Sequence, residues 1–183
     1  MVRTLVLGGA RSGKSAHAER IAQQNGGEVV YIATAQASDI EMAARIAHHQ
    51  RGRPSHWTTV EEPLMLADAI ARHAAPGTTI IVDCLTLWLS NLMFSDARSY
   101  PEDGSAQLPP LVFEQHAALL EAMRSPVCDV IFVSNEVGLG IMPMGAVTRF
   151  FVDEQGRLNQ ALAAQCDRVM FVAAGLPLML KDA

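Results

Sequence analysis

Short apolar runs rich in β-branched residues recur along the chain, and longer stretches with helical spacing separate most of them. The runs cover residues 4–7, 29–33, 79–82, 130–134 and 169–172. Continuous apolar runs of this length are typical of strands that are buried on both faces of a parallel sheet. The pattern therefore predicts a central, mostly parallel sheet built from these five strands.

The stretches between the runs predict helices. They cover residues 14–24, 39–50, 63–74, 85–93, 110–124 and 146–165. Alternation of strands and helices is typical of a layered α/β fold with helices on both faces of the sheet. Because one hydrophobic core usually serves about 100 to 200 residues, we predict a single domain over residues 1–183.

Residues 95–110 interrupt this alternation. Pro101, Gly104, Pro109 and Pro110 stand among polar residues there, a composition typical of a loop. We predict that the chain loops between the helices at 85–93 and 110–124.

Composition excludes several classes of protein. Half of the residues are hydrophobic and 18% are charged, which argues against disorder. No apolar run approaches the roughly 20 residues that a membrane-spanning helix needs. The N-terminal run turns into glycines before it reaches the length of a secretion signal. We therefore expect a cytoplasmic protein with no membrane partner.

The cysteines add no further chemistry. Cys84, Cys128 and Cys166 are odd in number, lie far apart and form no Cys-x-x-Cys pair. This arrangement supports neither a disulfide framework nor a zinc site, so we expect three reduced cysteines in the core.

The formal net charge of −5 disfavours a broad nucleic-acid surface, because such a surface needs clustered Lys and Arg. Residues 43–60 are a local exception, since they include no acidic residue. The basic groups of this stretch are Arg45, His48, His49, Arg51, Arg53 and His56. The stretch is either a solvated face or a patch that receives an anion.

The strongest motif is a P-loop between the first predicted strand and the first predicted helix. The pattern G-x-x-x-x-G-K-[ST] is matched at every fixed position by Gly8, Gly9, Ala10, Arg11, Ser12, Gly13, Lys14 and Ser15. The glycines let backbone N–H groups turn toward an anion, and the helix adds its positive end. Lys14 is expected to reach the β and γ phosphates of a nucleotide, and the Ser15 hydroxyl to hold Mg²⁺.

Asp83 follows the apolar run at 79–82, as the acid of a Walker B strand does. Such a carboxylate is delivered to the Mg²⁺ site of P-loop enzymes. Taken alone, an acidic residue at the end of an apolar strand is explained equally well as a metal ligand and as an ordinary surface residue.

Two further segments carry groups suited to chemistry. His48 and His49 lie near the end of a predicted helix. A neutral imidazole beside guanidinium groups can attack phosphorus. Adjacent helical residues point about 100° apart, so the two histidines cannot both serve as the nucleophile.

Asn135 and Glu136 follow the strand at 130–134, where polar side chains face the ligand crevice of an open α/β sheet. From spacing alone, surface histidines and a capped turn explain these residues as well.

Together these residues resemble the bifunctional adenosylcobinamide kinase and adenosylcobinamide-phosphate guanylyltransferase family of cobalamin biosynthesis. The resemblance covers nearly the whole chain, and its most specific parts are the block from His48 to Pro54 and the Asn135-Glu136-Val137-Gly138-Leu139-Gly140 segment. The other matching segments are the P-loop, Tyr31 to Ala35, 39–46, His56 to Thr59, Asp83 to Trp88 and Gly156 to Gln160.

The resemblance implies a RecA-like P-loop NTPase fold and a homo-oligomer, a trimer. It implies that a corrinoid, adenosylcobinamide, is phosphorylated with ATP or GTP, and that GMP passes from GTP through a guanylylated His48 to adenosylcobinamide phosphate. Arg51 and Arg53 would serve the α phosphate. Further nucleotide contacts implied by the resemblance are Ala33, Thr34, His49, Gln50, Gly52 and Glu61.

Two other hypotheses fit a P-loop, because the motif alone does not name a reaction. One is a small-molecule kinase in which His48 is incidental. The other is a nucleotide-dependent switch that controls a protein partner, although the chain shows no extended charged tail that would serve one.

Overall fold

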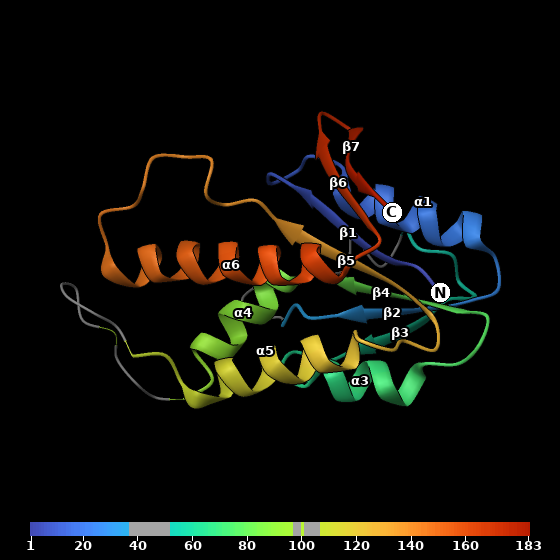
Figure 1. Ribbon diagram of the computed structural model, residues 1–183, viewed down its shortest axis with the longest axis horizontal. Helices are drawn as coiled ribbons and strands as arrows, with labels where there is room; N and C mark the ends of the chain where they lie inside the picture. The colour runs from blue at the N-terminus through green and yellow to red at the C-terminus, as the bar shows by residue number, and fades with distance from the viewer. Residues whose placement is uncertain (37–51, 97–99, 101–106) are drawn as a thin grey trace.

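The computed structural model describes residues 1–36, 52–96, 100 and 107–183, and strands and helices mostly alternate along them (Figure 1). The strands are β1 (Arg3–Gly8), β2 (Glu28–Ala33), β3 (Thr58–Glu61), β4 (Thr78–Asp83), β5 (Asp129–Asn135), β6 (Arg168–Ala173) and β7 (Leu176–Asp182). The helices are α1 (Lys14–Asn25), α3 (Leu66–His73), α4 (Leu85–Met93), α5 (Pro110–Ala122) and α6 (Ala146–Gln165).

The strands form one seven-stranded sheet in the order β3-β2-β4-β5-β1-β6-β7. All neighbours are parallel except β6 and β7. The register sets Gly8 opposite Asn135, and Ala33 opposite both Asp83 and Glu61. The carboxyl ends of the parallel strands therefore meet at one edge of the sheet, where open α/β sheets bind ligands.

The side chains of each strand divide between two cores, because successive residues point to opposite faces. Leu5, Leu7, Ile80 and Val82 pack with α3, α4, α5 and α6. On the other face, Val6 and its neighbours on β2, β4 and β5 pack with Ala18 and Ala22 of α1. Figure 1 shows the same division, with α1 apart from the other helices. Helices on both faces of a mostly parallel sheet are what the sequence predicts.

The five predicted strands are confirmed, and the helices at 85–93 and 146–165 begin and end where they were predicted. The prediction for 63–74 was wrong at its start, since α3 begins at Leu66. The Glu62 carboxylate accepts hydrogen bonds from the N–H groups of Leu64 and Met65, at 3.2 and 2.9 Å, and so stabilises a turn ahead of the helix. The helix predicted at 39–50 lies outside the described residues, as do 97–99 and 101–106 of the predicted loop.

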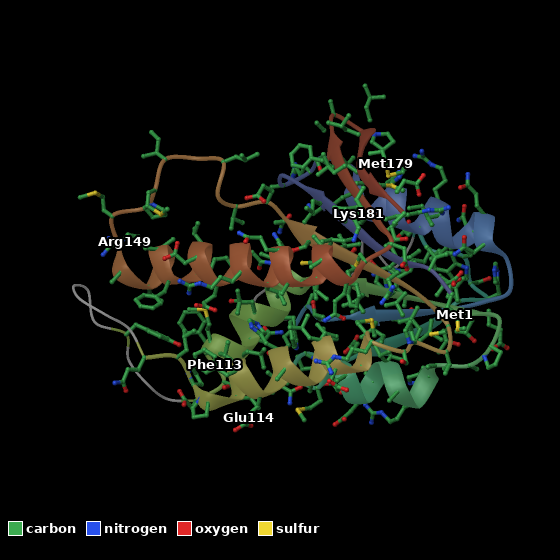
Figure 2. The ribbon with its side chains drawn as sticks, in the orientation of Figure 1. Met1, Phe113, Glu114, Arg149, Met179 and Lys181 are labelled. Atoms are coloured by element: carbon green, nitrogen blue, oxygen red, sulfur yellow. The ribbon has the colours of Figure 1, made fainter. Side chains whose placement is uncertain are left out.

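Two strands were missed. β3 has four residues, three of which are exposed, so it lacks the apolar run of a buried strand. β7 is an antiparallel edge strand whose apolar side chains are mostly exposed. It is held by Lys181, labelled in Figure 2, whose ammonium donates to the carbonyl oxygens of Ala163, Ala164 and Cys166 at the end of α6.

Within the described ranges, no helix combines the length and the apolarity required to cross a bilayer. All three cysteines are free and buried, as the sequence predicts.

Asp167→Asn is expected to destabilise the fold by about 2 kcal/mol at neutral pH. The Asp167 carboxylate accepts two hydrogen bonds from the Arg3 guanidinium and one from the Arg3 N–H, and these lower its pKa to about 2. A carboxyl with a depressed pKa stabilises the fold above its unfolded pKa of about 4, and this contribution is lost as pH falls toward 2. Urea unfolding at pH 7 and pH 3 measures both effects.

Asp182→Asn is the matched control, because Asp182 also pairs with an arginine, Arg168, at 3.1 Å but in an exposed position. Exposed pairs contribute little, so this variant should unfold like the parent chain. An equal loss in both variants, or a loss for Asp167→Asn that is as large at pH 3 as at pH 7, would contradict the assignment.

Candidate active site

The P-loop joins the end of β1 to the start of α1 and has the backbone that an anion site requires. Gly13 has φ 95° and Arg11 has φ 55°, both in the left-handed region. Among the described residues, no side chain caps α1, and its first turn includes no acidic residue. The N–H groups at the start of α1 are thus left to an anion, which the helix dipole also attracts.

Gly8→Ala is expected to cost about 1–3 kcal/mol of stability, because a Cβ at Gly8 would lie 2.5 Å from the main-chain oxygen of Val172 and 2.5 Å from Ser12 Oγ. A strand carbonyl cannot move away as a flexible side chain can. The neighbouring Gly9→Ala is the control, since a Cβ there meets no described atom within 4 Å. Differential scanning calorimetry should separate the two melting temperatures, and equal values would contradict this account.

A pocket of about 610 Å³ opens beside the P-loop at the carboxyl edge of the sheet. It is lined by Ala10, Arg11, Ser12, Gly13, Lys14, Ser15, Ala16, Tyr31, Ala33, Ala35, Arg53, Asp83, Cys84, Leu87 and Asn135. The volume lies within the usual range for small-molecule and cofactor sites. One cavity thus joins the P-loop to the ends of β2, β4 and β5.

Lys14 is a buried cation in this pocket. Its ammonium donates to the carbonyl oxygen of Gly9 at 2.9 Å. Burial lowers the pKa of Lys14, and the Asp83 carboxylate is among the groups that oppose this shift. A desolvated ammonium interacts strongly with a nearby phosphate, because little water screens the charge.

Asp83 accepts a hydrogen bond from the hydroxyl of Tyr31, with 2.5 Å between the phenolic oxygen and Oδ2. The guanidinium of Arg53 stacks over the Tyr31 ring, 3.4 Å from its centroid. Burial raises the pKa of Tyr31 well above its ordinary value, and the charge of Asp83 adds to the effect. The phenol therefore stays protonated and acts as the donor.

Ser15 and Asp83 line the same pocket and offer a hydroxyl and a carboxylate oxygen. Hard oxygen ligands of this kind suit Mg²⁺, which in nucleotide sites takes few protein ligands and completes its shell with phosphates and water. In the part of the chain that the structure describes, no three His, Cys, Asp or Glu side chains gather as a self-sufficient metal site. The residues present thus fit a magnesium ion that arrives with a nucleotide.

The structure brings most of the predicted P-loop residues and Asp83 together, but not every predicted contact. Gly8 and Gly9 shape the loop without lining the pocket, and Gly52 and Glu61 also lie outside its lining. His48, His49, Gln50 and Arg51 lie outside the described residues.

Thr34 is fully buried and has a structural partner. Its hydroxyl donates to the carbonyl oxygen of Cys84 at 2.8 Å and accepts from the Cys84 N–H at 2.9 Å. These bonds tie the end of β2 to the turn after β4. The side chain of Thr34 therefore holds the main chain of Cys84, the residue after Asp83.

Asn135 lines the pocket, whereas Glu136 accepts a hydrogen bond from the N–H of Gly138. A buried network supports Asn135: Ser134 Oγ donates to Asn159 Oδ1 at 2.7 Å, and the Asn159 amide donates to the Asn135 carbonyl oxygen at 3.2 Å. Asn159 belongs to the Gly156 to Gln160 segment, so this matching segment of α6 braces the end of β5.

Sequence reasoning did not assign a role to Tyr31, Ala35, Cys84 or Leu87, all of which line the pocket. One signal could have found Tyr31, because it lies two residues before Ala33 on a strand and therefore shares its face. Burial raises the pKa of the Cys84 thiol to about 11, so Cys84 contributes an apolar wall.

Comparison with known families and proteins identifies the class to which this site belongs. The family model described as cobinamide kinase / cobinamide phosphate guanyltransferase matches residues 4–180. The chain belongs to that family. The bifunctional enzyme class predicted from the sequence is thus confirmed.

Two curated relatives show how far the similarity extends. The bifunctional adenosylcobalamin biosynthesis protein CobP of Pseudomonas aeruginosa is 49% identical over 180 residues, 98% of this chain and 98% of the relative. The corresponding protein CobU of Salmonella typhimurium is 41% identical over 179 residues, 97% of this chain and 98% of the relative.

Solved structures support the fold class. A prototypical ATPase from the type III secretion system of pathogenic bacteria aligns with a TM-score of 0.58 at 12% identity, over 97% of this chain and 56% of its own. The assembled ATPase EscN of enteropathogenic E. coli aligns with a TM-score of 0.60 at 12% identity, over 94% of this chain and 43% of its own. The chain thus spans about half the length of these structures, and the P-loop NTPase fold that was predicted is confirmed.

Proposed function

We propose that the chain phosphorylates a hydroxyl of adenosylcobinamide with ATP or GTP, and then transfers GMP from GTP to adenosylcobinamide phosphate, giving adenosylcobinamide-GDP. The observation that carries the proposal is the pocket in which Lys14, Ser15 and Asp83 meet at a P-loop, in a chain that belongs to a kinase and guanyltransferase family. The corrinoid is a substrate, and the nucleotide is the donor in both reactions.

In the kinase reaction, the P-loop amides and Lys14 hold the β and γ phosphates. The substrate hydroxyl attacks the γ phosphorus and releases its proton to water, the bond from that phosphorus to the bridging oxygen breaks, and the nucleoside diphosphate leaves with the electron pair. The protein's contribution is positioning and charge stabilisation, because this transfer needs little covalent chemistry from side chains.

In the guanylyl transfer, a ring nitrogen of His48 attacks the α phosphorus of GTP and pyrophosphate leaves. A phosphate oxygen of the corrinoid then attacks the same phosphorus and releases the imidazole. The P-loop would stabilise the leaving pyrophosphate, and Arg51 and Arg53 would serve the α phosphate. Support for Arg53 is its place in the pocket lining.

Ser15 and Asp83 would hold Mg²⁺, which neutralises charge on the phosphates when it is bound. Further proposed nucleotide contacts are Ala33, Thr34, His49, Gln50, Gly52 and Glu61. Glu61 and Ala33 are opposite each other in register at the carboxyl edge of the sheet, which supports this group. Thr34 has the least structural support in this group, because its hydroxyl bonds to Cys84, its N–H donates to the Asp83 carbonyl oxygen and its own carbonyl oxygen accepts from Asn91.

We also propose one transferase domain over residues 1–183, a homotrimer and a cytoplasmic location. Sedimentation equilibrium measures the oligomeric state directly, and a monomer at micromolar concentration would contradict the trimer.

The proposal is tested with purified protein, Mg²⁺ and GTP labelled at the α or the γ phosphorus. Label from the γ position should appear in adenosylcobinamide phosphate. Label from the α position should first appear on denatured protein and then move to adenosylcobinamide-GDP when unlabelled adenosylcobinamide phosphate is added. Protein that is never labelled by α-labelled GTP, while product still forms, would exclude the covalent route.

A further inference from the structure

Tyr31 joins two charged groups of the pocket that come from distant parts of the chain. Its hydroxyl donates to Asp83 Oδ2 at 2.5 Å, and its ring lies under the guanidinium of Arg53 at 3.4 Å. Tyr31 is 1% exposed, so both contacts are shielded from water. A single side chain thus sets the position of a carboxylate on β4 and of a guanidinium ahead of β3.

The register of the sheet explains how the phenol reaches the carboxylate. Tyr31 on β2 pairs with Ile81 on β4, two residues before Asp83. Tyr31, Ile81 and Asp83 therefore lie on the same face of the sheet, and the phenol extends along this face to the strand end. The bond uses Oδ2 of Asp83, and no hydrogen bond to Oδ1 is found among the described residues.

Within the described ranges, Arg53 makes a stacking contact and no ion pair. Its Nε and NH1 atoms are buried and find no hydrogen-bond partner among the described residues, although Arg53 lines the pocket. A buried guanidinium with unsatisfied donors is costly unless a ligand satisfies them. Cation–π stacking keeps the group in place while leaving its N–H donors free for a phosphate.

We propose that Tyr31 is a positioning residue of the magnesium–nucleotide site: its hydroxyl fixes Asp83 and leaves Oδ1 to the metal, while its ring holds Arg53 for a nucleotide phosphate. This inference rests on the proposed binding of Mg²⁺ and nucleotide in the pocket. The two contacts have separate effects, because the hydroxyl acts through the metal ligand and the ring acts through the guanidinium.

The test measures binding of a fluorescent GTP analogue to the full chain as Mg²⁺ is titrated, and again in EDTA. Tyr31→Phe should raise the Mg²⁺ concentration for half-maximal binding by about tenfold, the usual effect of losing a partner that orients a metal ligand. Its affinity in EDTA should be unchanged, because the phenyl ring still carries Arg53. Arg53→Ala should weaken binding in EDTA as well.

Tyr100→Phe is the matched control. It also removes a phenolic hydroxyl, which donates to the main-chain oxygen of Met93 at 2.5 Å, away from the pocket lining. This variant should keep the Mg²⁺ dependence of the parent chain. An equal shift in both tyrosine variants would overturn the inference, because it would reflect a general loss of packing.

Asp83→Asn separates this inference from the proposed function. If Asp83→Asn leaves the Mg²⁺ dependence unchanged, the proposed metal site fails and the inference fails with it. If Asp83→Asn raises the Mg²⁺ requirement and Tyr31→Phe does not, only the role of Tyr31 is overturned. The effect of Tyr31→Phe should disappear in the Asp83→Asn background, since contacting groups are not additive, and an undiminished effect there would also overturn it.

Discussion

Lys14→Ala is expected to reduce both the kinase and the guanylyl-transfer rates by on the order of 10²–10³-fold. The Lys14 ammonium is buried in the pocket, and it is the P-loop cation that the sequence assigns to the β and γ phosphates. In the kinase reaction the Lys14 ammonium stabilises the transferred γ-phosphoryl group. In guanylyl transfer it stabilises the leaving pyrophosphate. Steady-state rates with γ-labelled and α-labelled GTP measure the two reactions separately.

Lys181→Ala is the matched control, because Lys14 and Lys181 are the two lysines of the chain. Lys181 donates to three carbonyl oxygens at the end of α6, so its loss should cost about 1 kcal/mol of stability. Both reaction rates should stay close to those of the parent chain. A kinase rate that survives Lys14→Ala would contradict a shared phosphate site.

The sequence predicts the centre of this fold well, because the buried strands and the helices that cover them carry unbroken apolar patterns. Residues 85–93 and 146–165 form α4 and α6 with the predicted bounds. The edges are different, since β3 and β7 leave many side chains exposed and so lack such a pattern. An exposed edge strand forms because it pairs with a neighbouring strand, and this pairing cannot be read from a short stretch of sequence.

The P-loop could be predicted because its residues are contiguous, and the backbone conformation follows from Gly8, Gly13 and the helix after them. Tyr31, Asp83 and Arg53 could not be joined in this way, because they come from three segments that only the sheet order brings together. Thr34 shows another limit, because its position after β2 does not reveal that its hydroxyl bonds to the main chain of Cys84. Chain position shows that a polar group lies near the site, but packing decides its partner.

His48→Ala is expected to abolish covalent labelling by α-labelled GTP and to lower guanylyl transfer by on the order of 10⁴-fold or more, as the loss of a covalent nucleophile does. The kinase rate should be retained, because in that reaction the substrate hydroxyl attacks phosphorus and Lys14 supplies the charge. The bond between phosphorus and an imidazole nitrogen is labile in acid and stable in alkali. The label on the parent chain should therefore be lost in acid and retained in alkali.

His49→Ala provides the control, since the two histidines are adjacent in an acid-free stretch and only one of them is proposed as the nucleophile. It should keep an acid-labile label, even if its affinity for GTP falls. Label that disappears from His49→Ala and persists in His48→Ala would move the nucleophile by one residue. Label that persists in both would exclude this pair. A parent chain with kinase activity, no label and no adenosylcobinamide-GDP would show that the P-loop pocket serves phosphoryl transfer alone.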